Sequence, residues 1–208
     1  MLETKMIHAA ERDSKRLMIV LHGLGDSMAG YAWVPQAVPF PWLNFLLVNA
    51  PDPYYGGFSW YDYAGDATTG VRRSIKLLSG LLDQQRQLGF PTEQTILSGF
   101  SQGCLMTLET GLRYPHKLAG IVGISGYLCD PQKLVKELSP VARDIPLLVT
   151  HGTFDPVVPI GQSRPQMEFL KKAGLNLEWR EFAKPHTIAG ELELGVIHQF
   201  IQSCFGMK

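Results

Sequence analysis

Short apolar runs alternate along this chain with longer segments of helical periodicity, and this alternation limits the fold more than any other feature. Parallel strands that are covered by helices on both faces are buried on both sides, so they read as continuous runs of valine, isoleucine and leucine. We therefore predict an α/β fold with a mostly parallel central sheet. The expected strands are Leu17–His22, Leu43–Asn49, Gln94–Phe100, Leu118–Ile124, Ile145–His151 and Leu177–Phe182, with Thr4–His8 as a weaker outer strand.

The segments between these runs predict the helices. Apolar residues at helical spacing, ended by Gly89, indicate an amphipathic helix over Thr69–Leu88. The stretch Asn49–Asp66 combines prolines, glycines and aromatic residues without a regular period, so we expect a structured loop there. A chain of 208 residues, 45% of them hydrophobic, is expected to form one domain over residues 1–208. The other expected helices are Gln102–Tyr114, Ser163–Lys172 and Ala189–Cys204.

Charge and cysteine usage exclude several classes of partner. Lysine plus arginine equal aspartate plus glutamate at 19 each, so no strong field collects nucleic acid. No apolar run approaches the roughly 18 residues of a membrane span, and the first residues lack the apolar core of a secretory signal. Three cysteines without ligand spacing (Cys104, Cys129, Cys204) argue against a disulfide framework and a zinc site. We expect a cytoplasmic protein with no stable membrane insertion, no metal and no cofactor; its oligomeric state, including a homodimer, is left open.

The segment Gly99–Gly103 reads G-F-S-Q-G, which matches G-x-S-x-G and lies between an expected strand and an expected helix. In that context the chain turns sharply, the serine is strained, and the residues two before and two after it must be small. The helix that follows points free N–H groups at the site, where they stabilise a developing anion. We therefore predict that Ser101 is a nucleophile.

A serine hydroxyl needs a base within hydrogen-bond reach and a third group that orients the base. On this scaffold the chain order is serine, acid, histidine. Asp155 follows the run Ile145–His151 at the carboxyl edge of the expected sheet, whereas Asp144 precedes that run at the opposite edge. Similarly, His186 follows the last expected strand, whereas His198 lies inside the last expected helix. We predict Asp155 and His186 as the other two catalytic residues.

An oxyanion hole requires two backbone N–H groups aimed at the oxygen that becomes negative. One is expected from Gln102, the residue after the nucleophile. The other is expected from Leu24, because it lies in the glycine-containing segment after the first central strand, where the backbone approaches a ligand closely. We interpret His22 as a support for this loop rather than as a second base.

Four parts of the chain together resemble the carboxylesterase, lysophospholipase and acyl-protein thioesterase family of small α/β hydrolases: His22–Asp26, Gly99–Gly103, His151–Asp155 and His186. The resemblance runs nearly end to end and implies the α/β-hydrolase fold without a large lid domain. Ser59–Asp62 also resembles the S-W-[YF]-D segment that flanks the substrate pocket in that family, which implies that Trp60 is a substrate-binding residue. The family has glycine at two positions where this chain has Pro185 and Cys104.

Together the residues and the resemblance predict a serine esterase that hydrolyses carboxylic esters of short to medium acyl chains through an acyl-enzyme. The same triad serves other leaving groups, so an acyl-protein thioesterase or a lysophospholipase is the first alternative. An alternative of another class is a catalytically idle binding module that keeps the fold. Peptidase and dehalogenase-like interpretations are disfavoured, because the nucleophile is serine and no further substrate domain is available.

Overall fold

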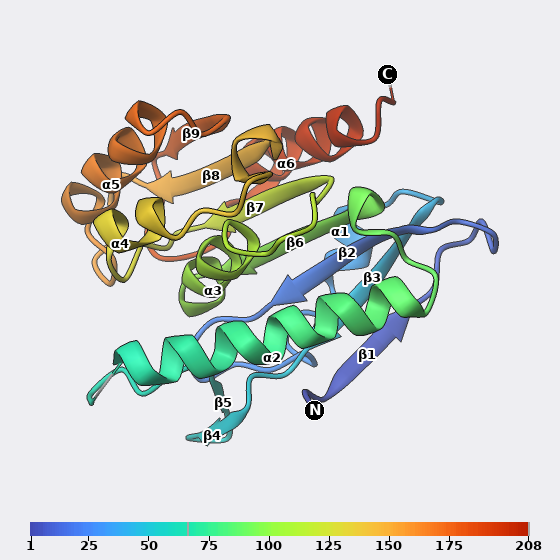
Figure 1. Cartoon of the computed structure of the whole chain (residues 1–208), viewed down its shortest axis with the longest axis horizontal. Coiled ribbons are helices and arrows are strands. Elements are labelled where there is room, and N and C mark those ends of the chain that lie inside the picture. Colours follow the sequence, from blue (N-terminus) through green and yellow to red (C-terminus); the bar gives the residue numbers. More distant parts are fainter. Residues whose placement is uncertain (66, 208) are drawn as a thin grey trace.

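The computed structural model describes residues 1–65 and 67–207. Within them, seven strands form one sheet: β1 (Thr4–Ile7), β2 (Arg16–Leu21), β3 (Leu43–Val48), β6 (Thr95–Phe100), β7 (Gly120–Ile124), β8 (Leu147–Gly152) and β9 (Leu177–Phe182). Their spatial order is β1-β3-β2-β6-β7-β8-β9, and all neighbours from β3 to β9 are parallel, whereas β1 is antiparallel to β3 (Figure 1). The mostly parallel sheet predicted from the sequence is confirmed.

The strands differ from expectation only at their ends. β7 begins at Gly120 rather than at Leu118, because the N–H of Ala119 is bonded to the carbonyls of Thr92 and Thr95 outside the β7 ladder. β8 begins after Pro146, whose nitrogen has no hydrogen to donate to a neighbouring strand.

Helices cover both faces of the sheet and enclose two apolar cores. On one face lie α2 (Ala67–Gln87), α3 (Gln102–Gly111), α4 (Pro131–Lys136) and α5 (Ile160–Lys172), which contribute residues such as Leu78, Leu105 and Met167 to the first core. On the other face lie α1 (Val34–Ala37) and α6 (Gly190–Cys204), which contribute Val34 and Ile197 to the second. The long helix α2 lies at the β1 side of the molecule in Figure 1, with its axis roughly along the direction of β2.

The expected loop Asn49–Asp66 contains a hairpin that the sequence did not reveal; Asp66 itself lies outside the described residues. Its strands are β4 (Asp52–Tyr54) and β5 (Gly57–Ser59). Tyr55 and Gly56 connect them with φ values of 43° and 88°, the left-handed conformation that a two-residue hairpin turn requires. Strands this short carry too few alternations for a period of two to be recognised. Four further elements are too short to show a helical period, so the sequence does not predict them: α1, α4 and the 3₁₀ turns η1 (Thr92–Gln94) and η2 (Ala142–Asp144).

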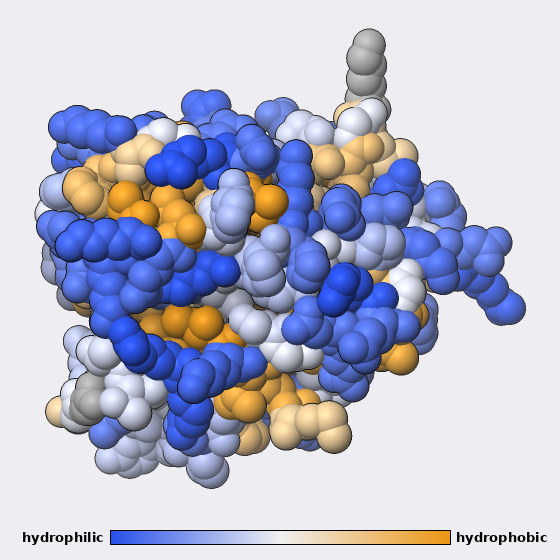
Figure 2. All heavy atoms as spheres, viewed as in Figure 1, coloured by the Kyte–Doolittle hydropathy of each residue, from blue (hydrophilic) through white to orange (hydrophobic). Residues whose placement is uncertain are grey.

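The parallel strands end at one edge of the sheet, and the loops that follow them carry the polar residues singled out above. Hydrophilic side chains cover most of the face shown in Figure 2, with apolar side chains in separate patches. Among the described residues, no helix has the length and apolar character needed to cross a bilayer.

Candidate active site

Ser101 lies in the sharp turn between β6 and α3 with φ 54°, a left-handed conformation that is strained for a residue with a side chain. The turn closes because its flanking glycines have no Cβ. A Cβ on Gly99 would lie 2.3 Å from the carbonyl oxygen of Gly103, and one on Gly103 would lie 2.4 Å from that of Leu21. The N–H of Ser101 donates to the carbonyl of Ile124, which ties the turn to β7 at 2.8 Å.

Asp155 lies in the loop after β8, and its side chain is fully buried. Its Oδ1 accepts the N–H groups of Val157 and Val158 at 2.9 and 2.8 Å, so the carboxylate organises its own loop. His151, near the end of β8, also contacts this loop: its Nε2 lies 2.8 Å from the carbonyl oxygen of Val158. The second carboxylate oxygen, Oδ2, is left to face His186.

His186 lies between the other two residues. Its Nδ1 is 2.7 Å from Oδ2 of Asp155, and its Nε2 is 2.8 Å from Oγ of Ser101. An imidazole with its proton on Nδ1 donates to the carboxylate and accepts from the serine. The N–H of Thr187 donates to the carbonyl of Pro185 at 2.8 Å, which places His186 at the centre of a three-residue turn. The structure thus brings together all three residues that the sequence singled out as a triad.

The carboxyl group of Asp155 is held in its ionised form. Burial by itself would raise its pKa, but the hydrogen bond from His186, those from the N–H groups of Val158 and Val157, and the proximity of the imidazole together outweigh burial and lower the pKa below its usual value. The negative charge that faces Nδ1 of His186 therefore persists to lower pH than on an ordinary aspartate.

A pocket of about 390 Å³ opens beside Ser101. This volume lies within the range of small-molecule sites. The predicted oxyanion residues Leu24 and Gln102 both line the pocket with Ser101 and His186. Gln102 is the first residue of α3, so its N–H is one of the donors that a helix leaves without an internal partner.

The loop that carries Leu24 is braced by the hairpin and by His22. Gly25 donates its N–H to the carbonyl of Phe58, and Phe58 donates to that of Asp26, both at 2.9 Å. His22 is buried, with Nδ1 2.6 Å from the carbonyl oxygen of Gly23 and Nε2 accepting the N–H of Ala50 at 3.0 Å. Both ring nitrogens are engaged in the backbone, which is the supporting role expected from the sequence.

Trp60 does not line this pocket, which corrects the role carried over from the resemblance. Its side chain is fully buried, and Nε1 donates to the carbonyl of His22 at 2.9 Å. Its backbone N–H donates to the side chain of Gln102 at 2.7 Å. An aromatic residue in an irregular segment is equally compatible with core and pocket, and here the indole fills the core behind the Leu24 loop.

The structure adds pocket residues that sequence reasoning missed, above all Tyr61 and Tyr127. Both line the pocket, and their hydroxyl groups are hydrogen-bonded to each other at 3.0 Å. Tyr61 directly follows Trp60 in the Ser59–Asp62 segment. Tyr127 follows β7 at the same edge of the sheet. This position in the chain is the feature of the sequence that could have indicated a pocket residue.

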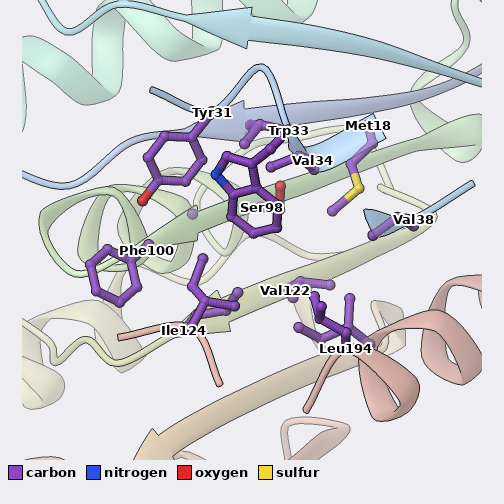
Figure 3. A pocket seen from close by; sticks show the side chains of 14 residues that line it. Met18, Tyr31, Trp33, Val34, Val38, Ser98, Phe100, Val122, Ile124 and Leu194 are labelled. Atoms are coloured by element: carbon purple, nitrogen blue, oxygen red, sulfur yellow. The ribbon is translucent and has the colours of Figure 1, made fainter. Parts of the chain in front are cut away.

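A second, apolar crevice adjoins the pocket beneath α1 and shares Tyr31 and Phe100 with it. Figure 3 shows these two rings at one end of the crevice and Met18 and Val38 toward the other. Its volume of about 30 Å³ is the space of one water molecule. The pocket at Ser101 is much the larger of the two.

The two positions that depart from the resembled family are both accommodated. Cys104 points into the core, where Gly123 and Gly126 leave room: a Cβ on either glycine would lie 2.7 or 2.5 Å from its Sγ. Burial raises the pKa of the Cys104 thiol to about 12, so it stays protonated. Pro185 is exposed and fixes the backbone just before His186. Neither residue lines the pocket.

Comparison with known proteins places this chain in a family. Residues 2–205 match the family model described as phospholipase/carboxylesterase. The chain belongs to the phospholipase/carboxylesterase family. An acyl-protein thioesterase 1 from Schizosaccharomyces pombe is 33% identical over 91% of both chains. One from Candida albicans is 30% identical over 95% of both. As a member of the phospholipase/carboxylesterase family, the chain is a carboxylic ester hydrolase.

Solved structures agree with this assignment. The crystal structure of esterase PE8 is 31% identical, covers 98% of this chain and 99% of its own, and superposes with a TM-score of 0.87. Acyl-protein thioesterase 2 from Zea mays has the same fold, with a TM-score of 0.83 and 24% identity over 98% of this chain and 99% of its own. The predicted α/β-hydrolase fold of the phospholipase/carboxylesterase family is thereby confirmed.

Proposed function

We propose that Ser101, His186 and Asp155 hydrolyse carboxylic esters of short to medium acyl chains through an acyl-enzyme. The observation that carries the proposal is the unbroken hydrogen-bond chain from Oγ of Ser101 through His186 to Asp155, at 2.8 and 2.7 Å, on the wall of a pocket. The same chain favours an enzyme over an idle binding module, because a strained serine with an oriented base has no use in binding alone.

In the first half-reaction, Oγ of Ser101 attacks the ester carbonyl carbon while Nε2 of His186 takes the hydroxyl proton. The carbonyl oxygen becomes negative and is stabilised by the N–H groups of Leu24 and Gln102. His186 then gives its proton to the departing alcohol or thiol as the tetrahedral intermediate collapses to the acyl-serine. In the second half, water attacks the acyl carbon by the same steps, and Ser101 regains its proton from His186.

A protein thioester is the second candidate substrate. The curated relatives reported above are named acyl-protein thioesterases, and Tyr63 and Val157 are exposed at a pocket rim that is open to the solvent. We place the enzyme in the cytoplasm, and the three unpaired cysteines support a reducing compartment. Hydrolysis rates for matched oxyesters and thioesters of increasing acyl length, on one preparation, separate these substrates.

The decisive test is the reaction of Ser101 with a fluorophosphonate probe. We expect the probe to label the wild type, and Ser101→Ala to abolish labelling and to lower kcat by about six orders of magnitude. Ser203→Ala is the matched control, because Ser203 lies on α6 and its Oγ donates to the carbonyl of Phe200. Full hydrolytic activity in Ser101→Ala would refute the proposed function.

A further inference from the structure

A buried ion pair spans the loop that carries His186. Nζ of Lys184 lies 2.5 Å from Oε1 of Glu193, and the two side chains are 2% and 0% exposed. Lys184 precedes His186 by two residues, and Glu193 lies in the first turns of α6. The pair therefore joins the start of the His186 loop to the helix that follows it.

Each partner also holds the backbone of the loop. Nζ of Lys184 donates to the carbonyl of Thr187, the residue after His186, at 2.8 Å. Oε2 of Glu193 accepts the N–H of Ala189 at 2.6 Å, which satisfies the residue that precedes α6. The two contacts hold the backbone at Thr187 and at Ala189, which lie between His186 and α6.

In this loop, Ile188 packs against the second apolar core and the His186 ring against Phe100, but both side chains are only partly buried. Of residues 183–190, Lys184 alone is buried. Its carbonyl accepts the N–H of Phe154 at 3.2 Å, so the same residue also contacts the loop of Asp155. Lys184 thus lies where the acid loop and the base loop meet.

A contribution to the free energy of unfolding does not by itself explain this ion pair. Burial of two charges carries a desolvation cost, and well-packed apolar residues of similar volume replace such pairs with equal or greater stability. Burial accordingly lowers the pKa of Lys184, against the opposing pull of Glu193 and Asp155. An aliphatic pair could fill the same volume, but it could neither donate to Thr187 nor accept from Ala189.

We propose that Lys184 and Glu193 are positioning residues for His186: they form a buried brace that fixes the loop and holds the imidazole in line between Ser101 and Asp155. The proposal rests on the proposed function, since it assigns to the brace the geometry of that triad. Misplacement of a reacting group by about 1 Å costs about 10²-fold in rate. The brace should therefore act on kcat rather than on substrate binding.

The test separates positioning from folding. Lys184→Met alone leaves Glu193 buried without a partner and should lower both Tm and kcat. The double variant Lys184→Met/Glu193→Leu removes both charges, so we expect it to recover Tm while kcat stays about 10- to 100-fold below wild type at nearly unchanged KM. The rate of fluorophosphonate labelling at Ser101 should fall in parallel. Wild-type kcat in the double variant would overturn the proposal.

Two further variants complete the design. Arg113→Met breaks a second ion pair, with Glu109, whose side chains are 17% and 3% exposed; neither residue lines the pocket at Ser101, so the variant should lower Tm with no change in kcat. Glu193→Gln keeps the side-chain volume and serves if the double variant does not fold; we expect a several-fold lower kcat at unchanged KM, and wild-type kcat there would also overturn the proposal. Ser101→Ala in the same assay identifies a failure of the proposed function itself, which would appear as residual hydrolysis.

Discussion

The two carboxylate oxygens of Asp155 have separate tasks. Oδ1 accepts two backbone N–H groups and shapes the loop, whereas Oδ2 faces His186. Burial raises the pKa of Asp155, but these bonds favour the ionised form and outweigh burial, so the folded protein lowers the pKa below its value in the unfolded chain. Stability from this residue is therefore present above the unfolded pKa of about 3.9 and is lost as the pH falls through the folded value.

Asp155→Asn should show both tasks in one variant. Turnover should fall by about four orders of magnitude, because the amide favours the wrong imidazole tautomer. The Tm difference from wild type should be largest at neutral pH. It should start to shrink below about pH 4, where the carboxyl group of the unfolded wild-type chain binds a proton, and should be smallest below the lowered pKa of the folded protein. Asp144→Asn, at the opposite sheet edge in η2, should change neither quantity. A Tm difference that widened on acidification would contradict this assignment.

At the scale of residues, the sequence predicts which side chains come together where their place after a parallel strand determines their position in the fold. Ser101 and Asp155 follow the buried strands β6 and β8, and His186 follows the partly exposed edge strand β9. Parallel strands bring the positions after them to one edge of the sheet. Lys184 and Glu193 carry no such signal: a lysine and a glutamate on either side of a loop normally lie in solvent, and only tertiary packing buries them together.

Among the elements, the ends of β8 and β9 must approach very closely. A Cβ on Gly152, the last residue of β8, would lie 2.3 Å from the carbonyl oxygen of Lys184 and 2.9 Å from that of Pro185. Glycine at this position therefore sets the separation between the acid loop and the base loop. This requirement is invisible in sequence, where Gly152 reads as an ordinary turn residue.

Gly152→Ala should force the two loops apart, with a loss of about 1–3 kcal/mol in stability and about 10²-fold in kcat. Gly80→Ala is the matched control, because Gly80 is exposed within α2 and its Cβ would meet open space. That variant should gain about 0.5–1 kcal/mol at unchanged kcat. Thermal unfolding and steady-state kinetics on both proteins test the prediction, which fails if Gly152→Ala keeps wild-type turnover.

At the scale of the whole molecule, the pocket is open and the surface is electrically balanced. The rim residues Tyr63 and Val157 are 67% and 59% exposed, and the lysines and arginines equal the acidic residues in number. Such a site needs no large opening motion at a lipid surface.

We therefore expect steady hydrolysis of dissolved short- and medium-chain esters, with no jump in rate when the substrate passes its solubility limit. Initial rates measured across that limit for one ester, with a chain-length series as the comparison, test this expectation. Activity confined to emulsified long-chain esters would contradict the open pocket.

Spatial order and chain order coincide across half of the sheet: β6, β7, β8 and β9 are neighbours in the order in which they are synthesised. Each can pair with the strand made just before it, so this half can grow one strand at a time as the chain leaves the ribosome. Ser101 emerges directly after β6, whereas His186 and Glu193 follow β9, the last strand added to this row. A chain interrupted before β9 thus presents the serine without its proposed base, so we expect hydrolysis only after the His186 loop has been made.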